Sequence, residues 1–414
     1  MNILHLTCSD EGGAGLAVLR LHESLLNIGI NSRVLVAEKS SSLDSVIKAL
    51  PSGHNVYTIS KNPLLAKVIR RLRKRGMFLT EIEKDELRLR KIPSSQRTFF
   101  TAPISRYEIH KHPLIEWADV IHLHWIEDFI DYPSFFSAID KPFVWTFHDE
   151  NIGLGGFHYT LTRDDFLLYY KDLEDKYIDV KRRALSGVKN LTMVALSDEM
   201  REFCSSKSFV QKRPIVRIPN SVNFNAFVPV DKINAKSILH IDKGALVFSF
   251  CSYELSDPRK GLRELLLALE YLKLPSVVLI CIGAGDLPIQ TNLKIYKTGT
   301  INDTNILSLM YSASDFFVMP SFQEAFAQTP MEALSCGTPV VAFPVSGTSD
   351  LINDGNGIRC EDFSVQSLVK GIKKGLETKF DSSQIREDIM RRYSPTIIAK
   401  QFISLYEDVI NNNR

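Results

Sequence analysis

The sequence predicts an α/β protein with two doubly wound domains, each built on a parallel β-sheet. Its 414 residues are too many for one ordinary hydrophobic core, so two domains are expected. Short apolar runs alternate with leucine-rich helical segments from Asn2 onward, and the same alternation restarts after Asp231. A hydrophobic fraction of 44% and a charged fraction of 24% are typical of a soluble globular protein.

The first strand–helix–strand unit lies at the start of the chain. Residues 2–6 form an apolar run, glycines follow, and leucines then recur at helical spacing until Gly29. Residues 33–37 are the next expected strand. Such a unit implies parallel strands joined by a right-handed crossover. Further strands of this domain are expected at residues 120–123, 143–146, 193–195 and 215–218.

The second domain repeats the alternation. Strands are expected at residues 246–251, 277–282, 315–319 and 339–343, and helices at 262–274, 305–312 and 330–335. The boundary falls near residues 219–231, where proline, asparagine and serine separate two strand-rich halves. The expected domains are therefore 1–218 and 219–396. A final helix, about residues 397–414, has no strand after it and could pack on either domain, including by crossing back to the N-terminal one.

A basic island interrupts the first domain. Between Lys61 and Lys91 there are eleven basic and four acidic residues, although the whole chain has a net charge of only +2. Residues 61–110 are expected to be a helical insertion, with an apolar stripe and basic residues over 64–75. This stripe suits either contact with an anionic membrane surface or a helix with a solvated basic face. No nucleic-acid partner is predicted, because the island lacks interleaved aromatic residues.

Cysteine usage and hydropathy predict the compartment. The six cysteines form no Cys-x-x-Cys pair, which indicates free thiols in a reducing environment. The N-terminus has no basic region before an apolar stretch, so no secretory signal is expected. Apolar runs are shorter than the roughly 18 residues that span a bilayer. We therefore expect a cytoplasmic protein, with peripheral contact at the inner face of the membrane as an alternative.

The strongest functional signal lies after the expected strand that ends at Met319. A loop carries Glu324, a helix begins near Gln328 to Pro330, and Glu332 is expected in its first turn. Free amides and the helix dipole at such a start favour a phosphate. Carboxylates beside an anion site need hydroxyl donors, which ribose and sugars supply. The segment therefore predicts a nucleotide-sugar site.

This segment, PSFQEAFAQTPMEALSCGTPVVA, resembles the retaining GT-B glycosyltransferases of family 4, the group 1 glycosyltransferases, through the Glu-x7-Glu spacing of Glu324 and Glu332. Other pieces resemble the family in the same order along the chain, over most of its length except about residues 40–110. They are EGGAGLAVLRL, HLHW, FVWTFHDE, IPNSVNFNAF, PRKGLRELLLAL and LSLMYSASDFFVMPS.

The resemblance implies a GT-B fold, in which two Rossmann-like domains face a central cleft. The N-terminal domain is then the acceptor side and the C-terminal domain binds the donor, a UDP- or GDP-sugar. The implied acceptor is a saccharide or a lipid-linked saccharide, in bacterial polysaccharide or glycoconjugate synthesis. The implied reaction retains the anomeric configuration and needs no metal and no cofactor, because the nucleotide sugar is a substrate.

The donor-side roles implied by the resemblance fall on few residues. Lys260 holds the donor pyrophosphate, and Arg259 assists it. Glu324 accepts hydrogen bonds from the transferred sugar, and Glu332 accepts them from the ribose. The remaining implied contacts are backbone amides offered to the phosphate and sugar by Ala325, Phe326 and Ala327.

The resemblance also implies roles in the N-terminal domain. His148 lies near the transferred sugar and completes a catalytic set with Glu324 and Lys260. Gly12 and Gly13 let the backbone approach donor or acceptor closely. His158 is a candidate for shaping the acceptor pocket, although an aromatic residue in a loop is more often packing.

Two departures from the family pattern stand out. The family places an arginine a few residues before Arg259, but residues 252–256 contain none, so either Arg259 substitutes or the site has one cation fewer. A subgroup of the family carries a cysteine where this chain has Phe157. If those cysteines are structural, the loop around Phe157 must be held in another way.

A metal is not expected. His122 and His124 flank Leu123 on one face of a strand, but no third ligand stands at a suitable spacing in the sequence. Other functions remain alternatives. They are a non-transferase sugar-nucleotide enzyme of the epimerase type and a catalytically silent nucleotide-sugar-binding protein. A dehydrogenase is disfavoured, because the opening glycines read EGGAG rather than Gly-x-Gly-x-x-Gly.

Overall fold

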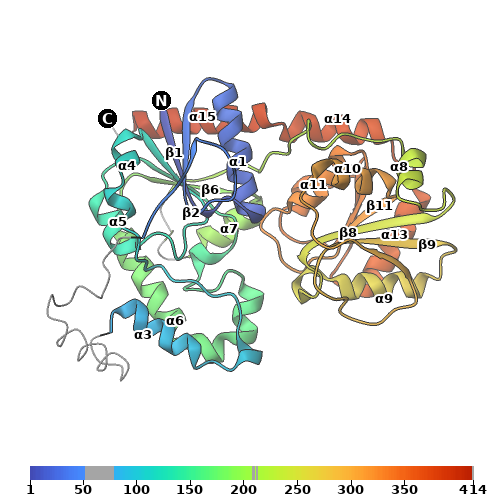
Figure 1. Cartoon of the computed structure of the whole chain (residues 1–414), viewed down its shortest axis with the longest axis horizontal. Coiled ribbons are helices and arrows are strands. Elements are labelled where there is room, and N and C mark those ends of the chain that lie inside the picture. Colours follow the sequence, from blue (N-terminus) through green and yellow to red (C-terminus); the bar gives the residue numbers. More distant parts are fainter. Residues whose placement is uncertain (52–78, 208–209, 211–212, 413–414) are drawn as a thin grey trace. The chain divides into compact units, whose positions relative to one another are not determined.

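A computed structural model describes residues 1–51, 79–207, 210 and 213–412. The chain forms two compact units (Figure 1). The N-terminal unit comprises Met1–Val194, Phe203–Val216 and Leu405–Arg414, and the C-terminal unit comprises Ala195–Glu202 and Arg217–Ser404. The main boundary therefore falls two residues before the expected one, and a short segment after residue 194 also belongs to the C-terminal unit. The basic stripe over residues 64–75 lies outside the described residues.

The N-terminal unit is built on a seven-stranded sheet in the order β3-β2-β1-β4-β5-β6-β7, and the pairs from β3 to β6 are parallel. Its strands are β1 (Asn2–Ser9), β2 (Asn31–Glu38), β3 (Val46–Lys48), β4 (Val120–Leu123), β5 (Phe143–Thr146), β6 (Leu191–Ala195) and β7 (Ile215–Arg217). The α-helices along this part of the chain are α1 (Gly12–Asn27), α3 (Glu81–Arg90), α4 (Pro113–Trp117), α5 (Tyr132–Ala138), α6 (Thr160–Ser186) and α7 (Asp198–Ser205).

The C-terminal unit is built on a six-stranded parallel sheet in the order β10-β9-β8-β11-β12-β13. Its strands are β8 (Leu246–Glu254), β9 (Val277–Ala284), β10 (Lys294–Lys297), β11 (Phe316–Met319), β12 (Val340–Ala342) and β13 (Gly357–Arg359). Its α-helices are α8 (Lys232–Ile238), α9 (Leu262–Leu272), α10 (Thr304–Ala313), α11 (Gln328–Ser335), α12 (Thr348–Leu351), α13 (Val365–Glu377) and α14 (Ser382–Tyr393), and the chain ends with α15 (Pro395–Asn411). Two doubly wound parallel domains are therefore confirmed.

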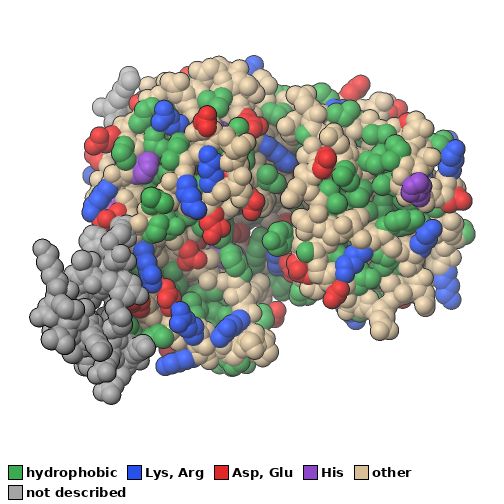
Figure 2. Space-filling view, viewed as in Figure 1, with side chains coloured by type: hydrophobic (Ala, Val, Ile, Leu, Met, Phe, Trp, Pro, Cys, Tyr) green, Lys and Arg blue, Asp and Glu red, His purple; other side chains and the backbone are tan. Residues whose placement is uncertain are grey.

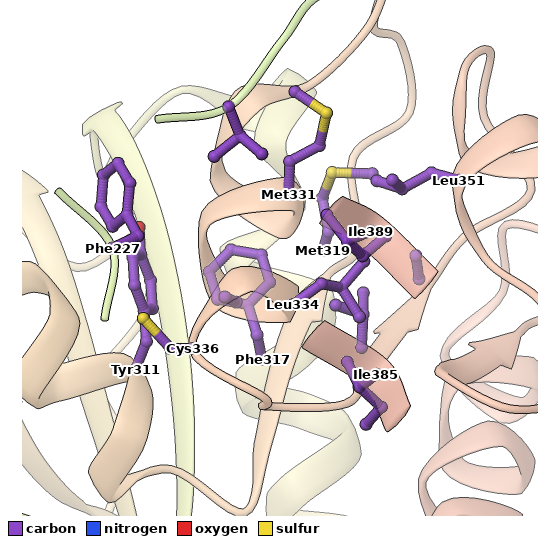
Figure 3. Close-up of a cluster of buried hydrophobic side chains, with 14 of the residues drawn as sticks. Phe227, Tyr311, Phe317, Met319, Met331, Leu334, Cys336, Leu351, Ile385 and Ile389 are labelled. Carbon is purple, nitrogen blue, oxygen red and sulfur yellow. The ribbon is translucent and has the colours of Figure 1, made fainter. Parts of the chain in front are cut away.

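Apolar side chains from both faces of the second sheet bury its strands. Helices α9 and α13 contribute to the cluster on one face, and α10, α11 and α14 contribute to the other. Figure 3 shows part of the second cluster, in which Phe317 and Met319 of β11 lie near Leu334 of α11 and Ile389 of α14. Continuous burial of β11 and β12 explains why both read as uninterrupted apolar runs.

The described part of the insertion is helical at α3. Thr80 and Glu83 form a capping box at the start of this helix. Buried Asp85 then accepts from Lys176 Nζ at 2.7 Å, which ties α3 to the long helix α6. The helix is therefore part of the N-terminal unit and not a free arm.

The surface carries charged side chains of both signs, and the cysteines are free thiols. On the face drawn in Figure 2, Lys and Arg side chains are interspersed with Asp and Glu over the described surface. All six cysteines are free, as expected. None of the helices in the described part of the chain combines the length and the hydropathy that a bilayer span requires.

The cluster around β11 generates a stability prediction. Phe317 is fully buried, so Phe317→Ala should leave a cavity and cost about 3–5 kcal/mol of unfolding free energy in the C-terminal unit. Urea unfolding followed by circular dichroism measures this loss. Because Trp117, Trp125 and Trp145 all lie in the N-terminal unit, tryptophan fluorescence is an internal control that should not shift. A loss below 1 kcal/mol would contradict the assigned packing.

Candidate functional site

The loops that carry the two central donor-side residues lie at the switch point of the second sheet. Strand order reverses between neighbours β8 and β11, so the chain leaves their carboxyl ends in opposite directions. The loop after β8 carries Lys260, and the loop after β11 carries Glu324. Ligands of doubly wound sheets bind outside the carboxyl ends of the strands at such a point.

Backbone contact holds these two loops together. A 3₁₀ turn, η5 (Pro258–Lys260), ends at Gly261, which has a φ of +72°. A Cβ on Gly261 would lie 1.9 Å from the carbonyl oxygen of Pro320, so only glycine permits the approach. The Phe322 amide also donates to the Arg259 carbonyl at 2.9 Å.

This approach brings Lys260 and Glu324 into an ion pair. Lys260 Nζ lies 2.5 Å from Glu324 Oε1, and the two side chains are 23% and 10% exposed. The structure thus unites two residues that are 64 positions apart in the chain. A cation for phosphate and a carboxylate for hydroxyl groups stand side by side, both within reach of solvent.

Helix α11 begins beside the pair. Ala327 is extended and the helix starts at Gln328, as expected. Among the described residues, the amides of Ala325, Phe326 and Ala327 donate to no protein group. They are therefore available to an anion at the helix start.

The expected place of Glu332 in the first turn of α11 is wrong, because it lies just beyond that turn. The helix starts two residues before Pro330, so Glu332 is its fifth residue, and the first turn holds no acidic side chain. Glu332 is only 7% exposed and accepts a hydrogen bond from buried Tyr311 at 3.3 Å. Because Glu332 lies inside the helix and is bonded to Tyr311, interaction with the helix dipole does not by itself explain its position.

Arg259 braces its own loop. Its Nη2 donates to Asp257 Oδ2 at 2.8 Å, and its amide donates to Asp257 Oδ1. Its expected role as a second pyrophosphate cation stays a prediction.

Gly12 and Gly13 are the first residues of α1 rather than a separate loop. Among the described residues, no atom lies within 4 Å of a Cβ built on either one. Gly15 is the close-packed glycine instead, since its Cβ would lie 2.5 Å from the Asp10 carbonyl carbon. The space beside Gly12 and Gly13 allows a close approach to the backbone, and which ligand uses it stays a prediction.

In the N-terminal unit, His148 lies at one end of a row of histidines. It follows β5, and its Nε2 is hydrogen-bonded to His124 Nδ1 at 3.1 Å. His124 follows β4, and its Nε2 is hydrogen-bonded to His5 Nδ1 on β1 at 3.0 Å. Sequence reasoning missed His5, because only the pairing of β1 with β4 brings residues 119 positions apart together.

A third histidine therefore does stand near His122 and His124, against the expectation. Potential ligand atoms of His5, His122 and His124 lie within 4.8 Å of one another. However, both His122 ring nitrogens already have hydroxyl partners, Tyr406 at 2.7 Å and Thr146 at 2.8 Å. These bonds satisfy His122 without a metal.

Burial keeps this row of histidines neutral near pH 7. Removal from water lowers the pKa of His5 and His124 well below the ordinary value, with smaller contributions from neighbouring rings. Burial also lowers the pKa of His148 to about 4, although Asp149 opposes the shift. A neutral imidazole has one donor and one acceptor nitrogen, so these rings act as hydrogen-bonding groups.

His158 is buried and bonded at both ring nitrogens. Nδ1 pairs with Asp149 Oδ2 at 2.5 Å, and Nε2 bonds Thr101 Oγ1 at 2.8 Å. Burial raises the pKa of Asp149, but His158 together with hydrogen bonds from the Asn151 amide and the Trp125 indole outweighs it, so the net shift is downward. His158 therefore holds the loop after β5, and contact with an acceptor stays a prediction.

The loop around Phe157 is held without cysteines. Fully buried Phe157 packs edge-on against Phe100, with ring centroids 4.9 Å apart. The amides of Gly155 and Gly156 each donate to the buried Glu174 carboxylate at 2.8 Å. An aromatic contact and a carboxylate clamp therefore hold the loop in this chain.

Comparison with known proteins agrees with this geometry. Residues 246–392 match the family described as glycosyl transferases group 1. A glycosyltransferase of Methanocaldococcus jannaschii is 23% identical over 312 residues, which cover 70% of this chain and 75% of that protein. An Escherichia coli UDP-Gal:α-D-GlcNAc-diphosphoundecaprenol α-1,3-galactosyltransferase is 26% identical over 239 residues, covering 53% of this chain and 61% of that protein.

The fold also has solved counterparts. The Anabaena protein HepE, in complex with UDP and glucose, superposes with a TM-score of 0.63 at 18% identity, covering 98% of this chain and 99% of that one. At this identity the likeness concerns the fold, which is GT-B. The matches together support a glycosyltransferase of the group 1 kind.

Gly261 should tolerate no side chain. Gly261→Ala should cost more than about 2 kcal/mol of unfolding free energy in the C-terminal unit, because a strained φ and a collision with backbone add. Gly299→Ala is the matched control, since Gly299 shares a φ of +72° but has open space around its Cβ among the described residues. Urea unfolding by circular dichroism compares the two. Equal losses would remove the argument for a close approach.

The N-terminal unit should lose stability in mild acid. Burial lowers the pKa of His22 and His148 to about 4, so protons bind the unfolded chain first as the pH falls. The free energy of unfolding of the N-terminal unit therefore has its full value above pH 6.5. It falls as the pH drops towards 4, by about 1.4 kcal/mol per pKa unit for each histidine. Urea unfolding followed by tryptophan fluorescence should show this slope, and His22→Gln should reduce it. A flat profile would contradict the prediction.

Proposed function

We propose that this protein is a retaining glycosyltransferase of family 4 that moves a sugar from a nucleotide diphosphate sugar to an acceptor hydroxyl. The observation that carries the proposal is the Lys260–Glu324 pair at the switch point of β8 and β11. A phosphate attracts the lysine, and sugar hydroxyls donate to the carboxylate. A nucleotide sugar presents both groups next to each other.

Donor binding would divide this pair between its two ligands. Lys260 would turn from Glu324 to the β-phosphate, and the amides of Ala325 to Ala327 would add donors at the start of α11. Glu324 would then accept from hydroxyls of the transferred sugar. Glu332, oriented by Tyr311, would accept from the ribose.

The proposed chemistry needs positioning and charge rather than a protein nucleophile. The bond from the anomeric carbon to the β-phosphate oxygen breaks, and the acceptor oxygen bonds to that carbon from the same face. The departing phosphate oxygen takes the acceptor's proton. Lys260 and the start of α11 offset the charge on the leaving phosphate, so the proposed reaction is metal-independent. The proposal gives His148 a place beside the transferred sugar.

The relatives support a choice of substrates. The Escherichia coli relative is named for a UDP-sugar donor and a diphosphoundecaprenol-linked acceptor, and the HepE structure holds UDP. We therefore favour a UDP-sugar over a GDP-sugar as donor, and a saccharide or lipid-linked saccharide as acceptor, in bacterial polysaccharide or glycoconjugate synthesis. Such an acceptor suits a cytoplasmic protein that touches the membrane surface, a role for which the sequence offers residues 64–75.

An epimerase-like enzyme and a silent nucleotide-sugar-binding protein are disfavoured, because the matched relatives are named as glycosyltransferases. Release of the nucleoside diphosphate separates the three. A transferase releases it when the acceptor is added, and neither alternative does so. Thermal-shift screening first identifies the donor, because a ligand at 100 times its Kd stabilises the fold by about 2.7 kcal/mol.

Lys260→Ala and Glu324→Ala should each lower turnover of the identified donor by about 100-fold or more, because each removes charge stabilisation at the reacting phosphate or sugar. Nucleoside diphosphate release with acceptor present measures the loss. Lys232→Ala is the matched control, since Lys232 also pairs with a carboxylate, that of Asp315 at 2.9 Å just before β11, at the opposite end of this strand. Retained turnover in both site variants, with an intact fold, would sink the proposal.

A further inference from the structure

The row of His5, His124 and His148 is a continuous hydrogen-bonded chain of three imidazoles. The two bonds are 3.0 and 3.1 Å long, and each joins an Nε2 to an Nδ1. His5 and His124 are buried, whereas His148 is half-buried at the outer end. His122 lies beside the chain but does not join it, because its two nitrogens bond Tyr406 and Thr146.

The number of protons on neutral imidazoles restricts this row of three histidines to two protonation states. A neutral imidazole carries one N–H, and each bond between two rings uses one N–H. His124 has a bond on each side, so it must donate to one neighbour and accept from the other. Both bonds therefore run in the same direction, and all three rings carry the proton on the same nitrogen, Nδ1 or Nε2.

His5, at the inner end of the row of histidines, favours one of these two states. His5 Nε2 is buried and has no hydrogen-bond partner among the described residues. If the protons occupied Nε2, His5 would bury an N–H without an acceptor, which is the rarer fault in native structures. If they occupy Nδ1, only a lone pair is left without a partner. In that state His148 presents an N–H at its second ring nitrogen.

We propose that His5 and His124 are positioning residues that hold His148 in the Nδ1–H tautomer, so that His148 donates a hydrogen bond to an oxygen of the reacting substrates. This inference rests on the proposed function for the identity of that oxygen, but not for the tautomer. His148 acts as a fixed neutral donor, which suits a reaction in which the leaving phosphate takes the proton. The chain also orients the ring, since turning His148 about its long axis would break the bond to His124.

Nitrogen-15 NMR of histidine-labelled full-length protein at pH 7 tests the tautomer without reference to turnover. The spectra should show His5, His124 and His148 all protonated at Nδ1. Protonation at Nε2, or different tautomers within the chain, would overturn the proposal. Elemental analysis of the same sample is part of the test, because one equivalent of a divalent metal that His5→Phe abolishes would assign the cluster to metal binding instead.

His124→Phe removes the partner of His148 and should convert its signals to a mixture of tautomers. His22→Gln is the matched control, because the ring nitrogens of buried His22 bond the hydroxyls of Ser32 and Ser45 and not His5, His124 or His148, so it should leave the tautomer of His148 unchanged. If His124→Phe does not fold, the smaller His124→Leu also removes both ring nitrogens and should release the tautomer as well. A single unchanged Nδ1–H signal for His148 in the folded variant would refute the positioning role.

Turnover gives a second readout once a donor is known. His124→Phe should lower kcat by roughly 10- to 100-fold with the donor KM unchanged. The variant misplaces His148, which belongs to the N-terminal unit, and leaves Lys260 in the C-terminal unit untouched. An unchanged kcat alongside a mixed tautomer would overturn the catalytic part of the inference. If no nucleotide sugar is turned over by the unaltered protein, the proposed function fails while the NMR result still decides the tautomer.

Discussion

The close approach of Gly261 to Pro320 is the constraint on which the proposed donor site depends. Strands β8 and β11 are adjacent in the sheet, and the polypeptide leaves them in opposite directions at the switch point. Without a contact between the two loops, the loops would separate. A glycine at φ +72° lets one loop rest against the carbonyl that ends the other. Lys260 and Glu324 then meet because their backbones already do. A cation and a carboxylate in contact, beside amides that have no partner in the described part of the chain, form a site complementary to a phosphate and a sugar together.

The ion pair is better understood as preparation for a ligand than as a source of stability. Lys260 and Glu324 are only 23% and 10% exposed, so the cost of taking both charges out of water offsets much of their attraction, and the pair adds little to stability. Burial elsewhere supplies the stability, through clusters such as that around Phe317. In the N-terminal unit, too, buried contacts stabilise the structure. Glu174 and Phe157 hold the loop in which one subgroup of the resembled family carries a cysteine.

Much of this architecture follows from local sequence. Strands over residues 120–123 and 143–146 were expected with their observed bounds, because buried parallel strands read as short apolar runs. The edge strand β10 was missed, since KIYK is short and polar. Glu324 and Lys260 could be singled out, but not their contact. His5 could not be found at all, because its meaning comes from the register of β1 against β4. Glu332 lies just beyond the first turn, because α11 begins at Gln328, the earliest of the expected start positions.

On the proposed function, the Lys260–Glu324 pair opens to admit a phosphate and a sugar. A crystal structure of the full chain with the nucleoside diphosphate selected by thermal shift tests it most directly. We expect the β-phosphate within hydrogen-bonding distance of Lys260 Nζ and of amides among Ala325 to Ala327, with Glu324 released from the lysine. A nucleotide bound elsewhere, with the 2.5 Å pair intact, would contradict it.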